Sequence, residues 1–247
     1  MSETRLDPWV EDPARIKLPR IGLLLVARQG VGRNALVDAL QSYRARVADR
    51  MPDDAMVRVG VRHSDDPLGS GVDEWDAMAS PDAAVEISWP SDATGVDFAA
   101  PVRGLAHDLA GVIDPARSVA VAGTCHLLET GEGPVLMAGG ARRVEGTTLQ
   151  ELSDWWLHHH GPLVLTVLDP KPLGYQQLHP DPDASWTVAA AAGVATTPLD
   201  MFVSAYFSSL DDFVAPLAKP GVAQRLREDE EGHYDHATMF GSMFQVL

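Results

Sequence analysis

The sequence holds little cysteine and little positive charge. One of its 247 residues is cysteine, Cys125, which excludes an internal disulfide and fits a reducing compartment. Lys and Arg total 19 against 35 Asp and Glu, so the formal net charge is −16. A nucleic-acid backbone is bound through clustered Lys and Arg, which this chain lacks, so we expect no nucleic-acid partner.

Long apolar runs are also missing. None approaches the roughly 18 residues that a membrane-spanning helix needs. Residues 1–20 are polar and interrupted by proline, without the apolar core of a signal peptide. We therefore expect a cytoplasmic protein with no membrane partner. Hydrophobic residues at 45% and charged residues at 22% fit a folded globular chain, which excludes disorder over most of its length.

The chain contains an internal repeat. Three segments of the first half recur in the second half at offsets of 114 to 116 residues. The matched pairs are residues 21–27 with 135–141, residues 61–66 with 177–182, and residues 97–102 with 212–217. One short match arises easily by chance, but three at nearly one offset indicate a twofold duplication. We divide the chain into an N-terminal arm (1–20), a first half (21–130) and a second half (131–247).

Both halves have the same predicted order of elements, β-α-β-β-α-β. In the first half we expect strands at residues 21–26, 56–63, 84–89 and 118–128, with helices at 35–50 and 98–113. In the second half we expect strands at 135–142, 173–179, 201–207 and 238–246, with helices at 149–160 and at 210–227, the latter either continuous or interrupted at Pro220-Gly221. This order is the ferredoxin-like unit, whose antiparallel sheet has helices on one face only. Two units packed through their open faces predict an α+β fold, an intramolecular α/β barrel with a cavity between the sheets.

Three short motifs in the second half carry a family resemblance. Trp156 is followed after three residues by His-Gly-Pro-Leu at 160–163, then by Tyr-Gln-Gln-Leu-His at 175–179 and Tyr-Asp-His at 234–236. In this order they resemble the EthD domain family of the dimeric α/β-barrel superfamily, over residues 134–247. The first half has no His-Gly-Pro. Chains of this superfamily usually pair, so the resemblance implies that a tandem copy forms the barrel as a monomer, or as a homodimer through other surfaces.

The resemblance limits the function without fixing it. Similar barrels include polyketide cyclases, dehydratases, cofactor-independent monooxygenases, lactone isomerases and haem-binding relatives. Because one fold hosts many chemistries, the function has to be argued from a site.

Alternation along the strand at 173–179 selects the first candidates. Tyr175, Gln177 and His179 share one face, and His63 lies on the matching face of the first half. Such a polar face suits a binding cavity with apolar walls. Alternatively, His63 and His179 lie half-exposed at strand ends, bonded to the aspartates that follow.

His160 is the second candidate. We expect it to end a helix, with Gly161 in a left-handed turn and Pro162 preventing continuation. There it stabilises the helix end as a cation, or it faces the ligand and exchanges protons near neutral pH. Neighbouring helical residues point about 100° apart, so the histidines at 158–160 cannot all meet one ion, and we expect no metal site. A haem ligand stays open as an alternative.

Three more side chains are assigned to substrate binding. Trp156 packs in the core or lines a pocket wall. Tyr206 alternates along its strand and faces either the helices or the barrel. Asp235 belongs to a polar segment before the last strand, which is otherwise a solvated segment.

These residues predict an enzyme that binds a small hydrophobic substrate, aromatic or cyclic. His160 and His179 would transfer protons in an elimination, dehydration or cyclisation without a cofactor, while Tyr175 and Gln177 orient a carbonyl or hydroxyl group. Two alternatives are a non-catalytic binding protein for a hydrophobic metabolite and a cofactor-independent monooxygenase.

Overall fold

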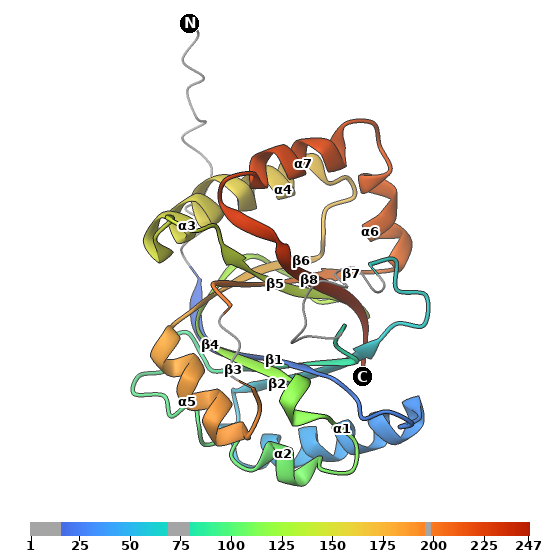
Figure 1. Cartoon of the computed structure of the whole chain (residues 1–247), viewed down its shortest axis with the longest axis vertical. Coiled ribbons are helices and arrows are strands. Elements are labelled where there is room, and N and C mark those ends of the chain that lie inside the picture. The colour runs from blue at the N-terminus through green and yellow to red at the C-terminus, as the bar shows by residue number, and fades with distance from the viewer. Residues whose placement is uncertain (1–15, 69–79, 196–198) are drawn as a thin grey trace, which may run out of the picture.

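A computed structural model describes residues 16–68, 80–195 and 199–247, in which eight strands close into a barrel with helices outside (Figure 1). The strands are β1 (Lys17–Leu25), β2 (Met56–Arg62), β3 (Ala83–Ser88), β4 (Val119–Thr130), β5 (Val135–Arg143), β6 (Gly174–Pro180), β7 (Met201–Phe207) and β8 (Tyr234–Val246). The helices are α1 (Arg33–Ala48), α2 (Leu105–Asp108), α3 (Leu149–Trp155), α4 (Gly161–Val167), α5 (Pro182–Ala192), α6 (Leu210–Leu217) and α7 (Val222–Glu230). A 3₁₀ turn, η1 (Pro115–Arg117), and a π-helix, η2 (Trp156–His160), complete the set.

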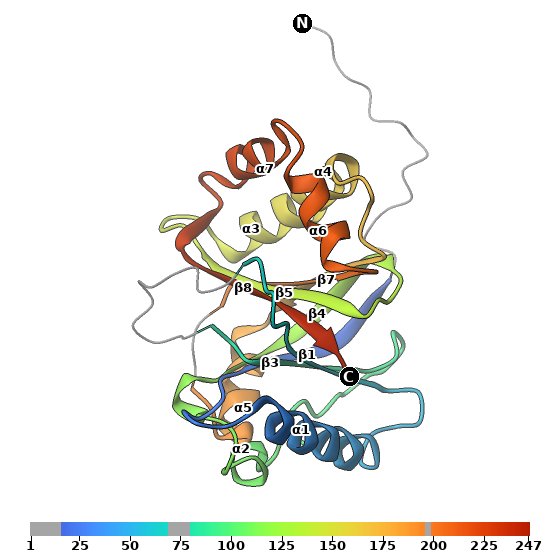
Figure 2. The same cartoon turned by 90° about the vertical axis from the view of Figure 1, so that its right-hand side faces the viewer.

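The strands follow one another around the barrel as β1-β3-β2-β8-β5-β7-β6-β4, and all of their pairings are antiparallel. The four strands of each half are neighbours in the barrel. Counted along the sequence of its own half, the fourth strand lies beside the first, the first beside the third, and the third beside the second. The halves join where β2 pairs with β8 and where β4 pairs with β6. Two views show the helices on the outer sides of the two sheets (Figures 1 and 2). The predicted mixed α/β barrel is therefore confirmed.

Two predicted boundaries are wrong. Residues 1–15 of the arm predicted at residues 1–20 lie outside the described residues. The rest of the arm is not separate from the barrel, because β1 already begins at Lys17. The helix predicted at residues 98–113 is helical only over Leu105–Asp108, because Pro101 lacks an amide hydrogen and Gly104 takes a φ of +80°.

Helix α5 was not predicted, although its ends carry ordinary signals. The Asp181 side chain accepts from the Ala184 amide, Pro182 starts the helix, and Gly193 ends it with a φ of +73°. Val188, Ala189 and Ala192 of α5 are fully buried in the core of the first half. This helix of the second half therefore covers part of the first sheet, next to the shortened α2.

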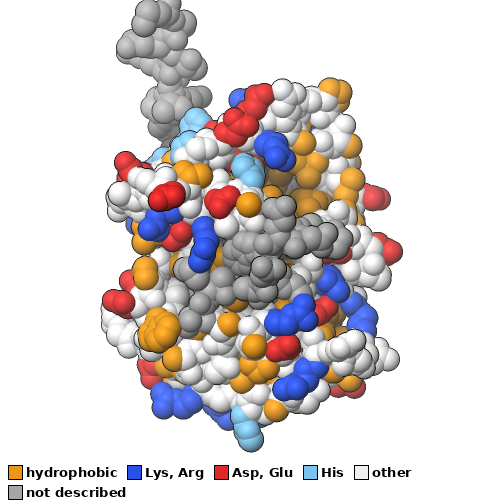
Figure 3. Space-filling view, in the orientation of Figure 1, with side chains coloured by type: hydrophobic (Ala, Val, Ile, Leu, Met, Phe, Trp, Pro, Cys, Tyr) orange, Lys and Arg blue, Asp and Glu red, His pale blue; other side chains and the backbone are white. Residues whose placement is uncertain are grey.

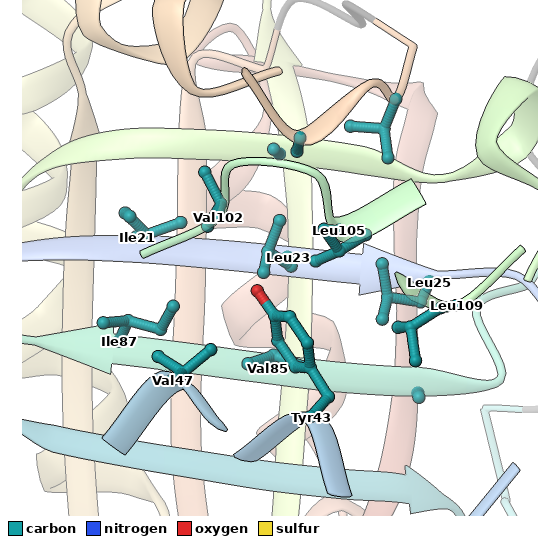
Figure 4. Packing of buried hydrophobic residues seen from close by; sticks show 14 of the residues in the cluster. Ile21, Leu23, Leu25, Tyr43, Val47, Val85, Ile87, Val102, Leu105 and Leu109 are labelled. Carbon is teal, nitrogen blue, oxygen red and sulfur yellow. The ribbon is translucent and has the colours of Figure 1, made fainter. Parts of the chain in front are cut away.

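Alternate residues of β1 and β3 build that core against α1 and the α2 region (Figure 4). The labelled members are Ile21, Leu23, Leu25, Tyr43, Val47, Val85, Ile87, Val102, Leu105 and Leu109. The intervening residues of the same strands point into the barrel. They include Arg20 and Glu86, each 1% exposed.

Side chains cross the space between the sheets, where we expected a cavity. Arg20 donates to Ser88 Oγ at 2.8 Å on its own sheet and to the Gln176 side chain on the opposite sheet. Glu86 accepts hydrogen bonds from Ser204 and Tyr206 across the barrel. The Phe202 ring lies 3.1 Å from the position of a Cβ on Gly22. The interior of the barrel is thus a packed core with a polar centre.

Two arginines and one glutamate dominate this centre. Arg58 Nη1 lies 3.7 Å from Glu86 Oε2 and donates to the Tyr206 hydroxyl at 3.2 Å. Burial alone would raise the pKa of Glu86, but Arg20, the two hydroxyl donors and Arg58 bring it below its usual value. Burial raises the pKa of Cys125 to about 11, so this thiol is inert at neutral pH.

Glu86→Gln should therefore lower the free energy of unfolding by about 3–5 kcal/mol, because two buried arginines lose their carboxylate. Urea unfolding at pH 7 measures the change. Because the pKa of Glu86 is depressed in the folded protein, its contribution is present above about pH 4.3, the unfolded value, and is lost as the pH falls further.

Glu132→Gln is the matched control. Glu132 also pairs with Arg58, but its side chain is 60% exposed, so its loss should cost less than about 1 kcal/mol. Equal effects of the two substitutions would contradict the assignment of the buried network to Glu86.

Candidate functional site

The outer face of the second sheet carries one long helix with a widened turn. Helix α3 begins with a capping box, in which the Glu151 carboxylate accepts from the Thr148 amide at 2.8 Å and the Thr148 hydroxyl accepts from the Glu151 amide at 3.2 Å. The chain then stays helical through η2 into α4. The predicted end at His160 is wrong, because Gly161 has a right-handed φ of −57° and Pro162 lies in the first turn of α4. A π-turn accommodates a proline that cannot donate its amide, and such turns often mark functional sites.

Gly161 is needed because the helix approaches the sheet closely at this point. A Cβ on Gly161 would lie 2.5 Å from Leu128 Cδ2 and 2.7 Å from Gln177 Nε2. The Gln177 amide donates to the Trp156 carbonyl of the π-turn at 2.9 Å. The Gly-Pro step and Gln177 together fix the direction of His160.

Gly161→Ala should destabilise the fold by about 1–3 kcal/mol, because the added methyl group displaces the Leu128 side chain and the Gln177 amide that donates to the Trp156 carbonyl. Chemical unfolding measures the loss. Gly111→Ala, at a position with open space around it, should change stability far less. Similar losses for the two variants would show that the close approach is unimportant.

His160 forms a dyad with Asp229 from α7. His160 Nδ1 lies 2.8 Å from Asp229 Oδ2, and His160 is 6% exposed. The other oxygen, Asp229 Oδ1, lies 2.8 Å from Nε2 of the exposed His159. His160 Nε2 faces Glu230 Oε1 at 3.9 Å, and Nδ1 of His236 lies 3.9 Å from Glu230 Oε2. Two consecutive carboxylates at the end of α7 thus face three imidazoles.

Aromatic rings complete this group of side chains. Trp155 stacks on His233 with ring centroids 3.9 Å apart and an interplanar angle of 10°, and its ring lies 5.0 Å from that of His160. Tyr234 contacts His236, with ring centroids 4.9 Å apart. Histidines lie among acidic and hydrophobic side chains in the upper part of the surface in Figure 3, over the second half. The dyad cluster is defined as Trp155, His159, His160, Asp229, Glu230, His233, Tyr234 and His236.

The environment shifts the pKa values of two members of the dyad cluster in opposite directions. Burial lowers the pKa of His160, and Asp229 opposes this only in part, so the imidazole is neutral at pH 7. Burial raises the pKa of Glu230, with a further contribution from Asp229 against the hydrogen bond from Tyr234. We assign the Nδ1–H tautomer to His160 from its contact with Asp229, which leaves Nε2 as an acceptor. A neutral base thus faces a carboxyl group that holds its proton more readily than usual.

Asp229→Asn should lower the pKa of His160 further, because the neighbouring carboxylate favours the imidazolium. NMR titration of the histidine ring protons measures this change. His63 in the first half serves as the internal control. An unchanged titration of His160 would mean that the dyad does not form in solution.

The residues predicted along β6 face the helices and not the barrel. Tyr175 is buried with Val164 and Leu168, and Gln177 bonds to the π-turn, while their neighbour Gln176 points inward to Arg20. Both faces of this strand are buried, so alternation alone could not assign them. The polar Gln176 belongs inside because a buried arginine needs an acceptor there.

His179 has partners different from those of His160. Its Nε2 lies 3.4 Å from Gln177 Oε1, and its ring centroid lies 4.6 Å from that of His126 and 4.8 Å from that of Trp156. Burial lowers the pKa of His179 to about 3, with a smaller contribution from His126. His179 is therefore neutral and weakly basic at pH 7.

The remaining predicted residues lie at other places. Trp156 is 1% exposed and packs in the core beneath the helix, and Tyr206 belongs to the barrel network. His63 Nδ1 accepts from the Asp65 amide at 3.2 Å, as in the strand-end alternative. Asp235 accepts from the Ala237 amide at 3.0 Å in a local turn beside the dyad cluster. The structure thus brings only part of the predicted set near His160, and the substrate-binding roles stay predictions.

Several members of the dyad cluster were not selected from the sequence. Asp229 and Glu230 belong to the acidic run at residues 228–231, a pattern typical of a solvated helix face, and His233 and His236 lie in the polar segment before the last strand. The available signal was the order of the EthD-like motifs, which places this run between the His-Gly-Pro and Tyr-Asp-His segments. Within residues 16–68, 80–195 and 199–247, no three His, Cys, Asp or Glu side chains converge as metal ligands.

Comparison with solved structures defines the class of fold. A proposed monooxygenase from Lactobacillus acidophilus is 8% identical with a TM-score of 0.51, and covers 94% of each chain. A haem-binding protein from Thermus thermophilus is 8% identical with a TM-score of 0.51, over 94% of this chain and 92% of that chain. A chlorite dismutase variant from Candidatus Nitrospira defluvii is 10% identical with a TM-score of 0.50, over 92% and 91%. The chain therefore has the fold of the dimeric α/β-barrel proteins.

A family match covers part of the second half. Residues 144–237 match the EthD domain, which confirms the resemblance drawn from the motifs over this range. The match includes the whole dyad cluster. No curated protein sequence matches the chain. In the described part of the chain, no helix has the length and apolar character needed to span a bilayer.

Proposed function

We propose that this EthD-domain barrel is an acid–base enzyme acting on a small, largely apolar molecule that is aromatic or cyclic. The observation that carries the proposal is the buried contact of 2.8 Å between His160 and Asp229, with Nε2 of His160 turned toward Glu230. An imidazole fixed by a carboxylate on one nitrogen and open on the other is an arrangement suited to a general base.

Each member has a defined role in an elimination or dehydration. Nε2 of His160 takes a proton from carbon, and the electron pair of that C–H bond forms the new double bond. Glu230 gives its proton to the departing hydroxyl group, which leaves as water. Asp229 holds the imidazole in place and stabilises the imidazolium. Positioned groups of this kind typically supply about 10²–10⁴-fold each.

His179, Tyr175 and Gln177 receive a positioning role in this proposal. Their partners are one another and the π-turn that directs His160. This replaces the earlier hypothesis that His160 and His179 act as a proton-transfer pair. Trp156 is retained as the wall beneath the turn, and Asp235 as part of the turn that carries His236. Tyr206 and His63, which lie elsewhere, are left without a substrate contact.

One of the similar structures is a haem-binding protein, but the described residues here do not fit a haem. His160 directs one ring nitrogen at Asp229 and the other toward Glu230. The space between the sheet and α4 and α6 is filled by packed side chains, among them Tyr175 and Phe207. We derive no step through a haem.

We propose further that the barrel is a tandem pair of ferredoxin-like units, with boundaries at 21–130 and 131–247. The shared strand order of the two halves supports a duplication. Because the two sheets cover each other within one chain, a monomer suffices to close the barrel, and a homodimer would use the outer surfaces. Since α5 of the second half packs in the core of the first, the halves should not fold separately.

A cofactor-independent monooxygenase is the second candidate, because removal of a proton from carbon is also the step that would prepare a substrate for attack by oxygen. One similar structure is a proposed monooxygenase. Oxygen consumption in step with product formation would favour this candidate, and product formation without oxygen would favour elimination.

His160→Gln should lower kcat/KM by about 10²–10⁴-fold on a cyclic hydroxy ketone that the wild type dehydrates. His179→Gln, the matched control, should lower it less than about tenfold because it removes only a positioning contact. Because burial lowers the pKa of His160, activity should hold down to below pH 6.5 and fall as the imidazole is protonated. Mass spectrometry of the products measures both variants.

If the two variants retain equal turnover, the proposed base is wrong. Tight binding without product by the wild type and both variants would instead support the non-catalytic binding protein.

A further inference from the structure

Three polar atoms around the dyad have no hydrogen-bond partner among the described residues. They are Nε1 of Trp155, Nδ1 of His233 and Nε2 of His236, and all three are buried at the level of the atom. A buried polar atom is normally paired, because leaving it unpaired costs its desolvation energy. Unpaired atoms are tolerated where a ligand or an ordered water supplies the missing partner.

The three atoms belong to one site. Trp155 and His233 are stacked on each other at 3.9 Å, and Trp155 lies beside His160 at 5.0 Å between ring centroids. His236 reaches the same place through Glu230, which also faces His160. The unpaired atoms therefore belong to side chains that lie next to His160, through the stacked rings of Trp155 and His233 or through Glu230.

The hydrogen-bonding capacity of these three atoms limits which ligand groups can pair with them. An indole N–H only donates, so the partner of Trp155 must be an acceptor such as an oxygen. The imidazoles of His233 and His236 donate or accept according to tautomer, which suits a carbonyl or hydroxyl oxygen. An uncharged N–H donor beside two carboxyl groups favours a neutral oxygen over a free carboxylate.

We infer that the substrate is a carbonyl compound whose oxygen is bound by the indole N–H of Trp155, with an acidic C–H next to the carbonyl directed at His160. This inference rests on the proposed function and names its substrate class. Nε2 of His160 takes the proton, the electron pair of the C–H bond forms the C=C bond, and the C=O π pair moves to the oxygen. The resulting enolate oxygen stays hydrogen-bonded to Trp155, which keeps its own proton.

The probe is 2-indanone, a cyclic aromatic ketone, and its control is indane, the same skeleton without the oxygen. The protein is labelled with ¹⁵N at its tryptophan indoles, of which it has six. Trp155→Phe assigns the Trp155 signal by its loss. We expect 2-indanone to shift the Trp155 N–H signal to lower field and indane to leave it in place.

Affinity gives the second measurement. Trp155→Phe should weaken 2-indanone binding about tenfold through loss of the hydrogen bond, with little effect on any binding of indane. Trp186→Phe, in an exposed tryptophan of α5, should leave the affinity unchanged. Thermal unfolding checks that both variants are folded.

Exchange in D₂O separates this inference from the proposed function. A shifted Trp155 signal without exchange of the 2-indanone C–H for deuterium would support the carbonyl contact. It would contradict the proposed role of His160 as the base. Exchange that His160→Gln abolishes, with an unshifted Trp155 signal and full affinity in Trp155→Phe, would keep the base and overturn the inference. The absence of any Trp155 shift with 2-indanone overturns it as well.

Discussion

The close approach of the π-turn to β6 is the contact on which the candidate site depends. Gly161 leaves no side chain between the helix and the strand, so Gln177 can reach the Trp156 carbonyl. Within this turn, His160 and the exposed His159 contact the two oxygens of the same carboxylate on α7, that of Asp229.

The polar network inside the barrel explains why the site lies outside it. Buried Arg20, Arg58 and Glu86 bridge the two sheets, and Phe202 packs against Gly22 beside them. A substrate there would have to displace charges that compensate one another, which is costly. On the outer face the dyad is buried, but its neighbours His159 and His236 are 66% and 27% exposed, so the dyad lies just beneath the surface.

The order of the elements could be predicted because alternation, turns and the repeat all pointed to the same arrangement. The face of β6 could not, since both of its faces are buried and only the position of Arg20 shows where Gln176 belongs. Helix α5 was missed despite Asp181 and Gly193 at its ends, because the repeat has no counterpart for it in the first half. The acidic run at residues 228–231 has the pattern of a solvated face, whereas Asp229 pairs with a histidine 69 residues away.

The two halves share a sheet order but differ in the helices that cover their sheets, and this difference places the candidate site on one side of the barrel. Helix α1 of the first half runs for 16 residues without a π-turn, and the outer face beside it is covered by α2 and by α5. The second half instead carries α6 and α7, and the end of α7 supplies Asp229 and Glu230. The two sheets close the barrel together, while the proposed acid–base pair depends on a helix that the described part of the first half lacks. The match of the EthD domain to the second half alone agrees with this asymmetry.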